Sequence, residues 1–298
     1  MNQQSLVSVI IPTYNRAEYV KKAVESVLNQ TYKNIEVIVI DGSPNDETEK
    51  ILQPYLVNSQ INYIHRNEIH DGTEKDKGNL ARARNQAIRI AKGKYIATLD
   101  DDDFWSNERK LEKQVQFLEN NPDYVACGGG SIVILGKSFL KKSSTLFPPL
   151  PQEKDEDIRK KMFFEFISGL SSLCFRKVSW GAVGGYDERL FLNEDQDFAF
   201  KLGTVGKLYN FQEYFISTLM GKQNKPNIEK FGRKRKKYEI SIIKKYQKNY
   251  PGASKAILYA QLYYFYYSLP FALQEFLGPL RGKIKRIIFP IIEKIYKS

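Results

Sequence analysis

Two groups of carboxylates are the first candidates for chemistry, because each lies at the end of an expected element. Four aspartates stand side by side at 100–103, directly after the apolar run 95–99. Like charges beside a low-dielectric core repel one another, so either their pKa values rise or a cation binds among them. A divalent ion such as Mg²⁺ or Mn²⁺ prefers oxygen ligands and completes its shell with substrate phosphates. The segment therefore predicts a metal–diphosphate site, and the alternative is a solvated acidic turn that caps the next helix.

The second group is Asn-Glu-Asp-Gln-Asp at 193–197, which precedes an apolar helical pattern at 198–202. Carboxylates are ordinary at a helix start, where the helix dipole and the free amides favour them. A general base likewise needs a carboxylate within hydrogen-bond reach of an acceptor hydroxyl. Asp195 fits that role if it stays ionised at neutral pH, as we expect at a helix terminus. Position in the chain leaves both interpretations open.

Short β-branched runs alternate with helical patterns in the first half of the chain. We expect strands at 6–11, 35–40, 61–64 and 95–99, and helices at 16–29, 46–57, 79–92 and 107–119. Asn15 with Glu18, and Asp46 with Glu49, have the spacing of an N-cap and its N3 carboxylate. The alternation predicts an α/β fold with a mostly parallel sheet flanked by helices, and ligands at the carboxyl ends of the strands.

The composition excludes several classes of protein. With 42% hydrophobic residues the chain can bury a sizeable core. Cys127 and Cys174 lie far apart and in no metal-ligand spacing, so neither a disulfide scaffold nor a zinc site is indicated. No G-x-G-x-x-G or Walker loop supports NAD or ATP chemistry. The apolar run 6–11 follows no basic region and leads into Pro12, so we expect cytosolic synthesis without export.

A series of motifs, taken in chain order, resembles the family 2 glycosyltransferases of the GT-A fold. The matching segments are 8–16, 37–43, 83–87 with 93–96, 99–105 and 194–195. The resemblance runs over roughly residues 6–205, and the combination of motifs is far more specific than any one of them. It implies an inverting transferase that moves a sugar from a nucleotide-diphosphate donor to an acceptor hydroxyl.

The resemblance and the residue chemistry together assign site residues. Asp195 is expected to be the catalytic base, and Asp100 and Asp102 to hold Mn²⁺ or Mg²⁺. The expected donor-nucleotide contacts are Pro12, Thr13, Tyr14, Asn15, Arg16, Asp41, Gly42, Arg84, Asp100 and Asp101. Weaker candidates for the acceptor or the diphosphate are Glu194, Trp105 and Lys222. Arg82, Arg84 and Lys77 could meet phosphate or base, although a solvated helix face explains Arg82 equally well.

The net charge of +12 is concentrated at one end of the chain. Residues 1–220 hold 28 basic and 30 acidic side chains, whereas residues 221–298 hold 18 basic and 4 acidic ones. No recognised nucleic-acid motif accompanies the basic cluster 233–237, so we expect no nucleic-acid partner. The uncharged, tyrosine-rich run 256–274 and the basic, isoleucine-striped run 283–297 favour binding of 254–298 to an anionic membrane surface. A solvated helical cap and a membrane span are the alternatives.

These expectations combine into one organisation of the chain. Residues 1–125 would form the nucleotide-sugar-binding half of a GT-A domain and 126–220 its acceptor-binding half, with strands at 124–127 and 132–135 and a helix near 155–168. Residues 221–298 would form a basic, aromatic-rich helical segment. The acceptor would be a glycan or a lipid-linked sugar, reached by a cytoplasmic enzyme peripheral to the inner face of the cell membrane. The alternatives are a non-catalytic sugar-nucleotide or polyanion binding module and a nucleotidyltransferase.

Overall fold

The computed structural model describes residues 4–65, 79–135, 144–147, 157–163, 170–190, 193–220 and 228–268. Its strands are β1 (Val7–Thr13), β2 (Ile35–Asp41), β3 (Asn62–His65), β4 (Tyr95–Thr98), β5 (Asp103–Trp105), β6 (Tyr124–Leu135), β7 (Ser144–Phe147), β8 (Cys174–Arg176) and β9 (Lys207–Met220). Its helices are α1 (Ala17–Leu28), α2 (Glu47–Val57), α3 (Leu80–Ile90), α4 (Lys110–Asn120), α5 (Lys177–Ala182), α6 (Glu194–Gly203), α7 (Ile228–Tyr246) and α8 (Ala253–Ser268). Two 3₁₀ turns, η3 (Ile158–Lys161) and η4 (Leu170–Ser172), lie between β7 and β8.

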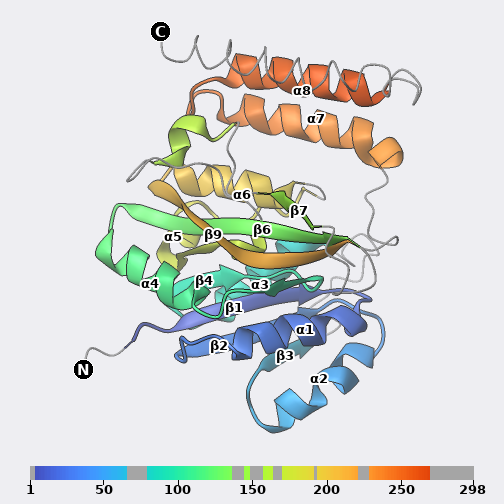
Figure 1. Cartoon of the computed structure of the whole chain (residues 1–298), viewed down its shortest axis with the longest axis vertical. Coiled ribbons are helices and arrows are strands. Elements are labelled where there is room, and N and C mark those ends of the chain that lie inside the picture. The colour runs from blue at the N-terminus through green and yellow to red at the C-terminus, as the bar shows by residue number, and fades with distance from the viewer. Residues whose placement is uncertain are drawn as a thin grey trace. The chain divides into compact units, whose positions relative to one another are not determined.

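The strands form one sheet in the order β3-β2-β1-β4-β8-β6-β9-β5, and β7 pairs with β6 (Figure 1). β1 pairs in parallel with β2 and β4, and β2 pairs in parallel with β3. Alternate residues of β1, among them Val7 and Val9, are fully buried in one core cluster with Val20 and Val24 of α1. The predicted α/β architecture is thus formed by its first four strands.

The second half of the sheet depends on pairing between distant segments. β6 is one continuous strand where two short strands were expected, and it pairs in parallel with β9 and antiparallel with β8. A Cβ atom on Gly129 would lie 2.4 Å from the ring of Phe215, so the close approach of β6 to β9 requires glycine there. Where a helix near 155–168 was expected, the described residues form only the short 3₁₀ turn 158–161.

The two helix starts that the capping pattern predicted differ from the expected geometry. Asn15 has a φ of 53° in the left-handed region, and the N-cap of α1 is Arg16, without a side-chain cap. Asp46 is the N-cap of α2, yet its carboxylate pairs with Lys50 at 2.8 Å instead of capping a backbone amide. The predicted capping boxes are therefore wrong, although both helices begin where they were expected.

The chain divides into two compact units. The first is Met1–Lys225 with Tyr246–Pro251, and the second is Pro226–Lys245 with Gly252–Ser298. Within the first unit, the hydroxyl of Tyr246 donates to Asp197 Oδ1 at 3.0 Å. In the part of the chain that the structure describes, no helix has the length and apolarity needed to cross a membrane. Residues 269–298, which carry much of the predicted membrane-binding segment, lie outside the described residues.

Candidate active site

The four aspartates at 100–103, here called the acidic turn, connect β4 to β5 at the carboxyl ends of β1, β2 and β4. The Leu99 amide donates to the Ile10 carbonyl oxygen at 3.1 Å, which carries the β1–β4 pairing up to the turn. The Asp103 amide donates to the Asp100 carbonyl oxygen at 3.1 Å and closes the turn. The sheet therefore presents these side chains at the edge where α/β folds bind ligands, as predicted.

The four carboxylates of the acidic turn point toward different partners. Asp100 accepts from Arg84, Asp101 from Thr13 and Arg16, Asp102 from Arg16, and Asp103 from the hydroxyl of Ser171. Burial raises the pKa of Asp101 to about 6 and the pKa of Asp103 to about 7, with repulsion from neighbouring aspartates as a smaller cause. The predicted repulsion among like charges therefore contributes to both raised pKa values. Positive charge from Arg16 and Arg84, which contact the turn, offsets part of this repulsion.

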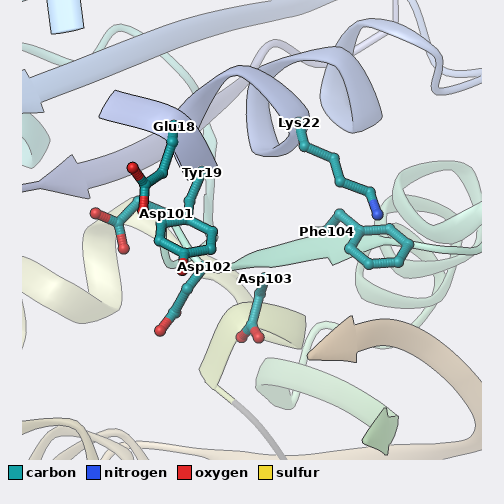
Figure 2. Close-up of a pocket in the computed structure, with 7 residues that line it drawn as sticks. All are labelled: Glu18, Tyr19, Lys22, Asp101, Asp102, Asp103 and Phe104. Carbon is teal, nitrogen blue, oxygen red and sulfur yellow. The ribbon is translucent and has the colours of Figure 1, made fainter. Parts of the chain in front are cut away.

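Two cavities flank the acidic turn and share Asp101 and Asp102 as a common wall. The first, of about 280 Å³, lies between the turn and α1 and is lined by Glu18, Tyr19, Lys22, Asp101, Asp102, Asp103 and Phe104 (Figure 2). The second, of about 320 Å³, is lined by Pro12, Tyr14, Arg16, Leu80, Asp100, Asp101 and Asp102. Five of the residues predicted to contact the donor thus line the second cavity.

Asp41 was predicted to contact the nucleotide base, and the structure places it beneath the surface. Its carboxylate is fully buried and accepts hydrogen bonds from the Ser43 amide at 2.8 Å and from the Tyr63 hydroxyl at 2.8 Å. The Gly42 amide donates to the Thr13 carbonyl oxygen at 3.0 Å, so it too is engaged. In this structure Asp41 and Gly42 support the loop after β2 and tie it to the end of β1.

Arg84 links the acidic turn to the start of α6. Its side chain is buried, and its two terminal nitrogens point to different carboxylates. Nη2 lies 2.6 Å from Asp100 Oδ1, and Nη1 lies 2.8 Å from Glu194 Oε1. Both terminal nitrogens are thus bound to acids in this structure, and the contact of Arg84 with the nucleotide stays a prediction. The same contacts place Glu194 in a buried ion pair, where it was predicted to meet the acceptor or the diphosphate.

Asp195 follows Glu194 in the first turn of α6 and is half-buried. Its Oδ1 accepts a hydrogen bond from the Gln196 amide at 2.6 Å. Burial, with the charge of Glu194 as a second cause, raises the pKa of Asp195 to about 7, although Arg84 acts in the opposite direction. The sequence indicated that Asp195 could remain ionised at neutral pH, and burial shifts its pKa toward that range. A carboxylate that titrates near neutrality is well suited to accept a proton from a hydroxyl.

The turn 184–188 is fastened to α3 by the side chain of Asn85. Its amide nitrogen donates to the carbonyl oxygen of Tyr186 and to Glu188 Oε1, both at 2.9 Å, and its Oδ1 accepts from the Tyr186 amide at 2.9 Å. Gly185 has a φ of 69°, and a Cβ atom there would lie 2.6 Å from Asn85 Oδ1. Arg82 also reaches this turn, because its Nε atom lies 3.1 Å from Glu188 Oε2. α3 therefore holds both the 184–188 turn and the start of α6.

Trp105 was predicted as a weaker candidate to meet the acceptor or the diphosphate, and in this structure it is buried. The ring is 4% exposed, and its N–H donates to the Ser171 carbonyl oxygen at 2.8 Å. The Nζ atom of buried Lys110 lies 3.9 Å from the ring centroid. Ser171, which the sequence did not single out, accepts from the Asp100 amide at 3.1 Å and donates to Asp103. Trp105 and Ser171 thus hold the acidic turn from the core side.

Asp100 and Asp102, the predicted metal ligands, both line the second cavity. Their side chains are 37% and 24% exposed. The described residues contain no group of three or more His, Cys, Asp or Glu side chains that could hold an ion. Mg²⁺ and Mn²⁺ commonly use one or two carboxylates and complete their shell with phosphate oxygens. The pair therefore fits an ion that binds together with a diphosphate.

Comparison with known proteins identifies the family. The model of Glycosyl transferase family 2 matches residues 8–181. An uncharacterized glycosyltransferase of Methanocaldococcus jannaschii is 31% identical over 254 residues, which cover 82% of this chain and 80% of that protein. The chain belongs to glycosyl transferase family 2. The predicted family and the predicted glycosyltransferase activity with a nucleotide-sugar donor are therefore confirmed.

One further relative of this family 2 enzyme and one solved structure have names that state an activity. The UDP-Glc:alpha-D-GlcNAc-diphosphoundecaprenol beta-1,3-glucosyltransferase of Escherichia coli is 45% identical over 114 residues, 38% of this chain and 41% of that protein. A mannosyltransferase from Pyrobaculum calidifontis, solved in complex with GDP-Man and Mn²⁺, matches with a TM-score of 0.60 at 18% identity, over 88% of this chain and 70% of that one. The second match confirms the predicted GT-A-like fold.

The family 2 site also contains residues that the sequence pattern did not reveal, and it leaves some predicted ones without a position. Tyr63 and Ser43 hold Asp41, and Ser171 holds the acidic turn. Regular alternation in 61–64 predicts a strand, but only the observed register between β2 and β3 shows that the Tyr63 hydroxyl reaches Asp41. Lys77 and Lys222 lie outside the described residues.

Proposed function

We propose that this family 2 enzyme transfers the sugar with inversion of configuration in a single displacement. The Asp195 carboxylate removes the proton from an acceptor hydroxyl as its oxygen attacks the anomeric carbon. The bond between that carbon and the diphosphate oxygen breaks, and nucleoside diphosphate leaves with the electron pair. No acid is needed on the leaving group, which distinguishes this chemistry from glycoside hydrolysis.

The observation that carries this proposal is the bridge made by Arg84. Its contacts of 2.6 Å to Asp100 and 2.8 Å to Glu194 bring the acidic turn and the base-bearing start of α6 to one guanidinium group. A donor held at the acidic turn would therefore have its reacting carbon near Asp195. Effective catalysis by displacement depends on such prior placement of donor, acceptor and base.

The donor would occupy the second cavity, with its diphosphate at Asp100 and Asp102. These two carboxylates would hold Mn²⁺ or Mg²⁺, which stabilises the negative charge that grows on the departing diphosphate. The complex of the Pyrobaculum calidifontis mannosyltransferase with GDP-Man and Mn²⁺ supports this assignment. In this scheme residues 1–125 bind the nucleotide sugar and residues 126–220 help to bind the acceptor.

The pH dependence of the rate follows from the environment of Asp195. Because burial raises the pKa of this carboxyl to about 7, the base is largely protonated below that pH and ionised above it. We expect kcat/KM to rise about tenfold per pH unit below the pKa and to level off above it. The measurement is an initial-rate profile from pH 5.5 to 9 at saturating metal. A flat profile over this range would count against Asp195 as the base.

The acceptor is proposed to be a glycan or a lipid-linked sugar at the inner face of the cell membrane. The name of the Escherichia coli relative, which acts on a diphosphoundecaprenol-linked sugar, supports a lipid-linked acceptor. Residues 221–298 contain 18 basic and 4 acidic residues, and this positive charge supports attachment to anionic lipid. We expect the protein to sediment with phosphatidylglycerol-containing vesicles at low salt, to be released by high salt, and not to sediment with phosphatidylcholine vesicles. Equal sedimentation with both vesicle types would contradict an electrostatic contact.

A panel of nucleotide sugars with Mn²⁺ and with lipid-linked or oligosaccharide acceptors tests the activity itself. The proposal predicts release of nucleoside diphosphate together with a glycosylated acceptor. Release of inorganic diphosphate from nucleoside triphosphates would instead indicate a nucleotidyltransferase. Binding of nucleotide sugars without any turnover would indicate a binding module.

A further inference from the structure

Arg16 places one nitrogen atom between two carboxylates of the acidic turn. Its Nη1 lies 2.8 Å from Asp102 Oδ2 and 3.2 Å from Asp101 Oδ1. Asp101 is buried and is also held by the Thr13 hydroxyl at 2.8 Å, so one end of this arrangement is fixed to β1. Asp102 is more exposed and lines both cavities, and Figure 2 draws it among the residues that line the first. The guanidinium group thus supplies positive charge where the proposed metal would bind.

The side chain of Arg16 is partly exposed, whereas the loop that carries it is held by other contacts. Its side chain is 45% exposed and lines the second cavity, where the donor diphosphate is proposed to bind. The loop that carries it is fixed separately, because the Asn15 amide donates to the Ser43 hydroxyl at 2.8 Å. A small rotation of the guanidinium group would keep the Asp101 contact and exchange the Asp102 contact for a diphosphate oxygen. Arginine is well suited to this exchange, because it forms strong hydrogen bonds to carboxylates and phosphates alike.

We propose that Arg16 is an exchange residue that couples metal binding to diphosphate binding. Without donor, its guanidinium neutralises Asp102 and weakens the binding of a divalent ion alone. With metal and diphosphate both bound, Asp102 would hold the ion and Arg16 would contact the diphosphate. Metal and diphosphate then raise each other's affinity by the same factor, as linkage requires. This inference rests on the proposed metal–diphosphate site, but it makes no use of sugar transfer or of Asp195.

The charges around Asp102 set the sign of the effect. Four carboxylates form the turn, and among the residues that the structure describes the arginines that contact them are Arg16 and Arg84. Arg84 is buried against Asp100 and Glu194, so Arg16 is the exposed one of the two and the one that reaches the second cavity. Removal of its charge makes the turn more negative, which favours a free divalent cation and disfavours an anionic diphosphate.

The test measures two binding constants in the wild type, Arg16→Gln and Arg16→Lys. Mn²⁺ binding alone is followed by the loss of the electron paramagnetic resonance signal of the free ion. Binding of methylenediphosphonate, a diphosphate that carries no base or sugar, is followed by calorimetry with Mn²⁺ present. For Arg16→Gln we expect Mn²⁺ alone to bind roughly three- to tenfold more tightly and the diphosphonate roughly tenfold more weakly. For Arg16→Lys, both binding constants should lie between those of the wild type and those of Arg16→Gln.

Arg109→Gln is the matched control, because it removes an exposed arginine whose partner is Glu112 on α4. Both of its binding constants should stay within about twofold of the wild type. If Arg16→Gln leaves the Mn²⁺ constant unchanged or weakens it, Arg16 does not compete with the ion and the inference is wrong. If Mn²⁺ binds more tightly but the diphosphonate is unaffected, the exchange step is wrong. Both measurements report binding and need no turnover, so they test this inference even if the proposed sugar transfer is wrong.

Discussion

Replacement of Asp195 by asparagine should lower kcat by about 10²–10⁴-fold, the usual range for loss of a general base. Asparagine keeps the size of the side chain but cannot accept a proton from the acceptor hydroxyl. The affinity for nucleoside diphosphate with Mn²⁺ should not change, because Asp195 does not line the second cavity. The free energy of unfolding should not fall. Burial raises the pKa of Asp195, so the ionised carboxylate destabilises the folded state, and a neutral asparagine avoids this penalty.

The measurement is kcat with the best donor and acceptor, together with the dissociation constant of nucleoside diphosphate. Asp123→Asn provides the control, because it changes an exposed aspartate whose carboxylate lies 3.3 Å from the Nζ atom of Lys207. Its rate should match the wild type. The residual rate of Asp195→Asn should also lose the rise with pH near neutrality. If Asp195→Asn keeps the wild-type rate, Asp195 is not the general base.

Replacement of Arg84 by methionine should cost about 3 kcal/mol of unfolding free energy, at the lower end of the cost of breaking a buried ion pair. The lower end applies because Asp100 is 37% exposed, whereas the Glu194 side chain is only 11% exposed. In a domain of this size that loss lowers Tm by roughly 10 °C. Catalysis should fall as well, because the bridge between the acidic turn and α6 is lost.

A second variant on the same helix distinguishes this cause from a simple packing defect. Without Arg84 the carboxylates of Glu194 and Asp100 lose the guanidinium group that contacts both of them. Arg82→Met, on the same helix but in a half-exposed pair with Glu188, should cost less than about 1 kcal/mol. Equal losses of unfolding free energy in Arg84→Met and Arg82→Met would contradict a stabilising role for the contacts of Arg84 with Asp100 and Glu194.

The first four strands were predictable because short β-branched runs of strand length can be read without knowing which strands pair. The runs 6–11, 35–40, 61–64 and 95–99 coincide closely with β1 to β4, and the acidic turn lies at the predicted sheet edge. β8 and the long β9 were not predicted, since their pairing with β6 joins residues such as Cys127 and Cys174 that are far apart in sequence. The split of β6 into two strands was wrong because Gly128–Gly130 interrupt the pattern without ending the strand.

The residue types at the site could be predicted better than their orientations. Arg84 and Trp105 have side chains typical of ligand contacts, and both are buried among supporting residues. Nothing in a linear pattern shows that the two nitrogens of Arg84 are taken by Asp100 and Glu194. The raised pKa of Asp195 could not be predicted for the same reason, because burial depends on what packs around the start of α6.

The anomeric configuration of the product is the most direct test of the proposed reaction. With a donor whose sugar is α-linked to the diphosphate, attack by the deprotonated acceptor hydroxyl in a single displacement predicts a β-linked product. Proton coupling constants at the anomeric carbon in the NMR spectrum of the purified product report this configuration. A β linkage agrees with Asp195 as the base of an inverting transferase, and an α linkage from the same donor would contradict it.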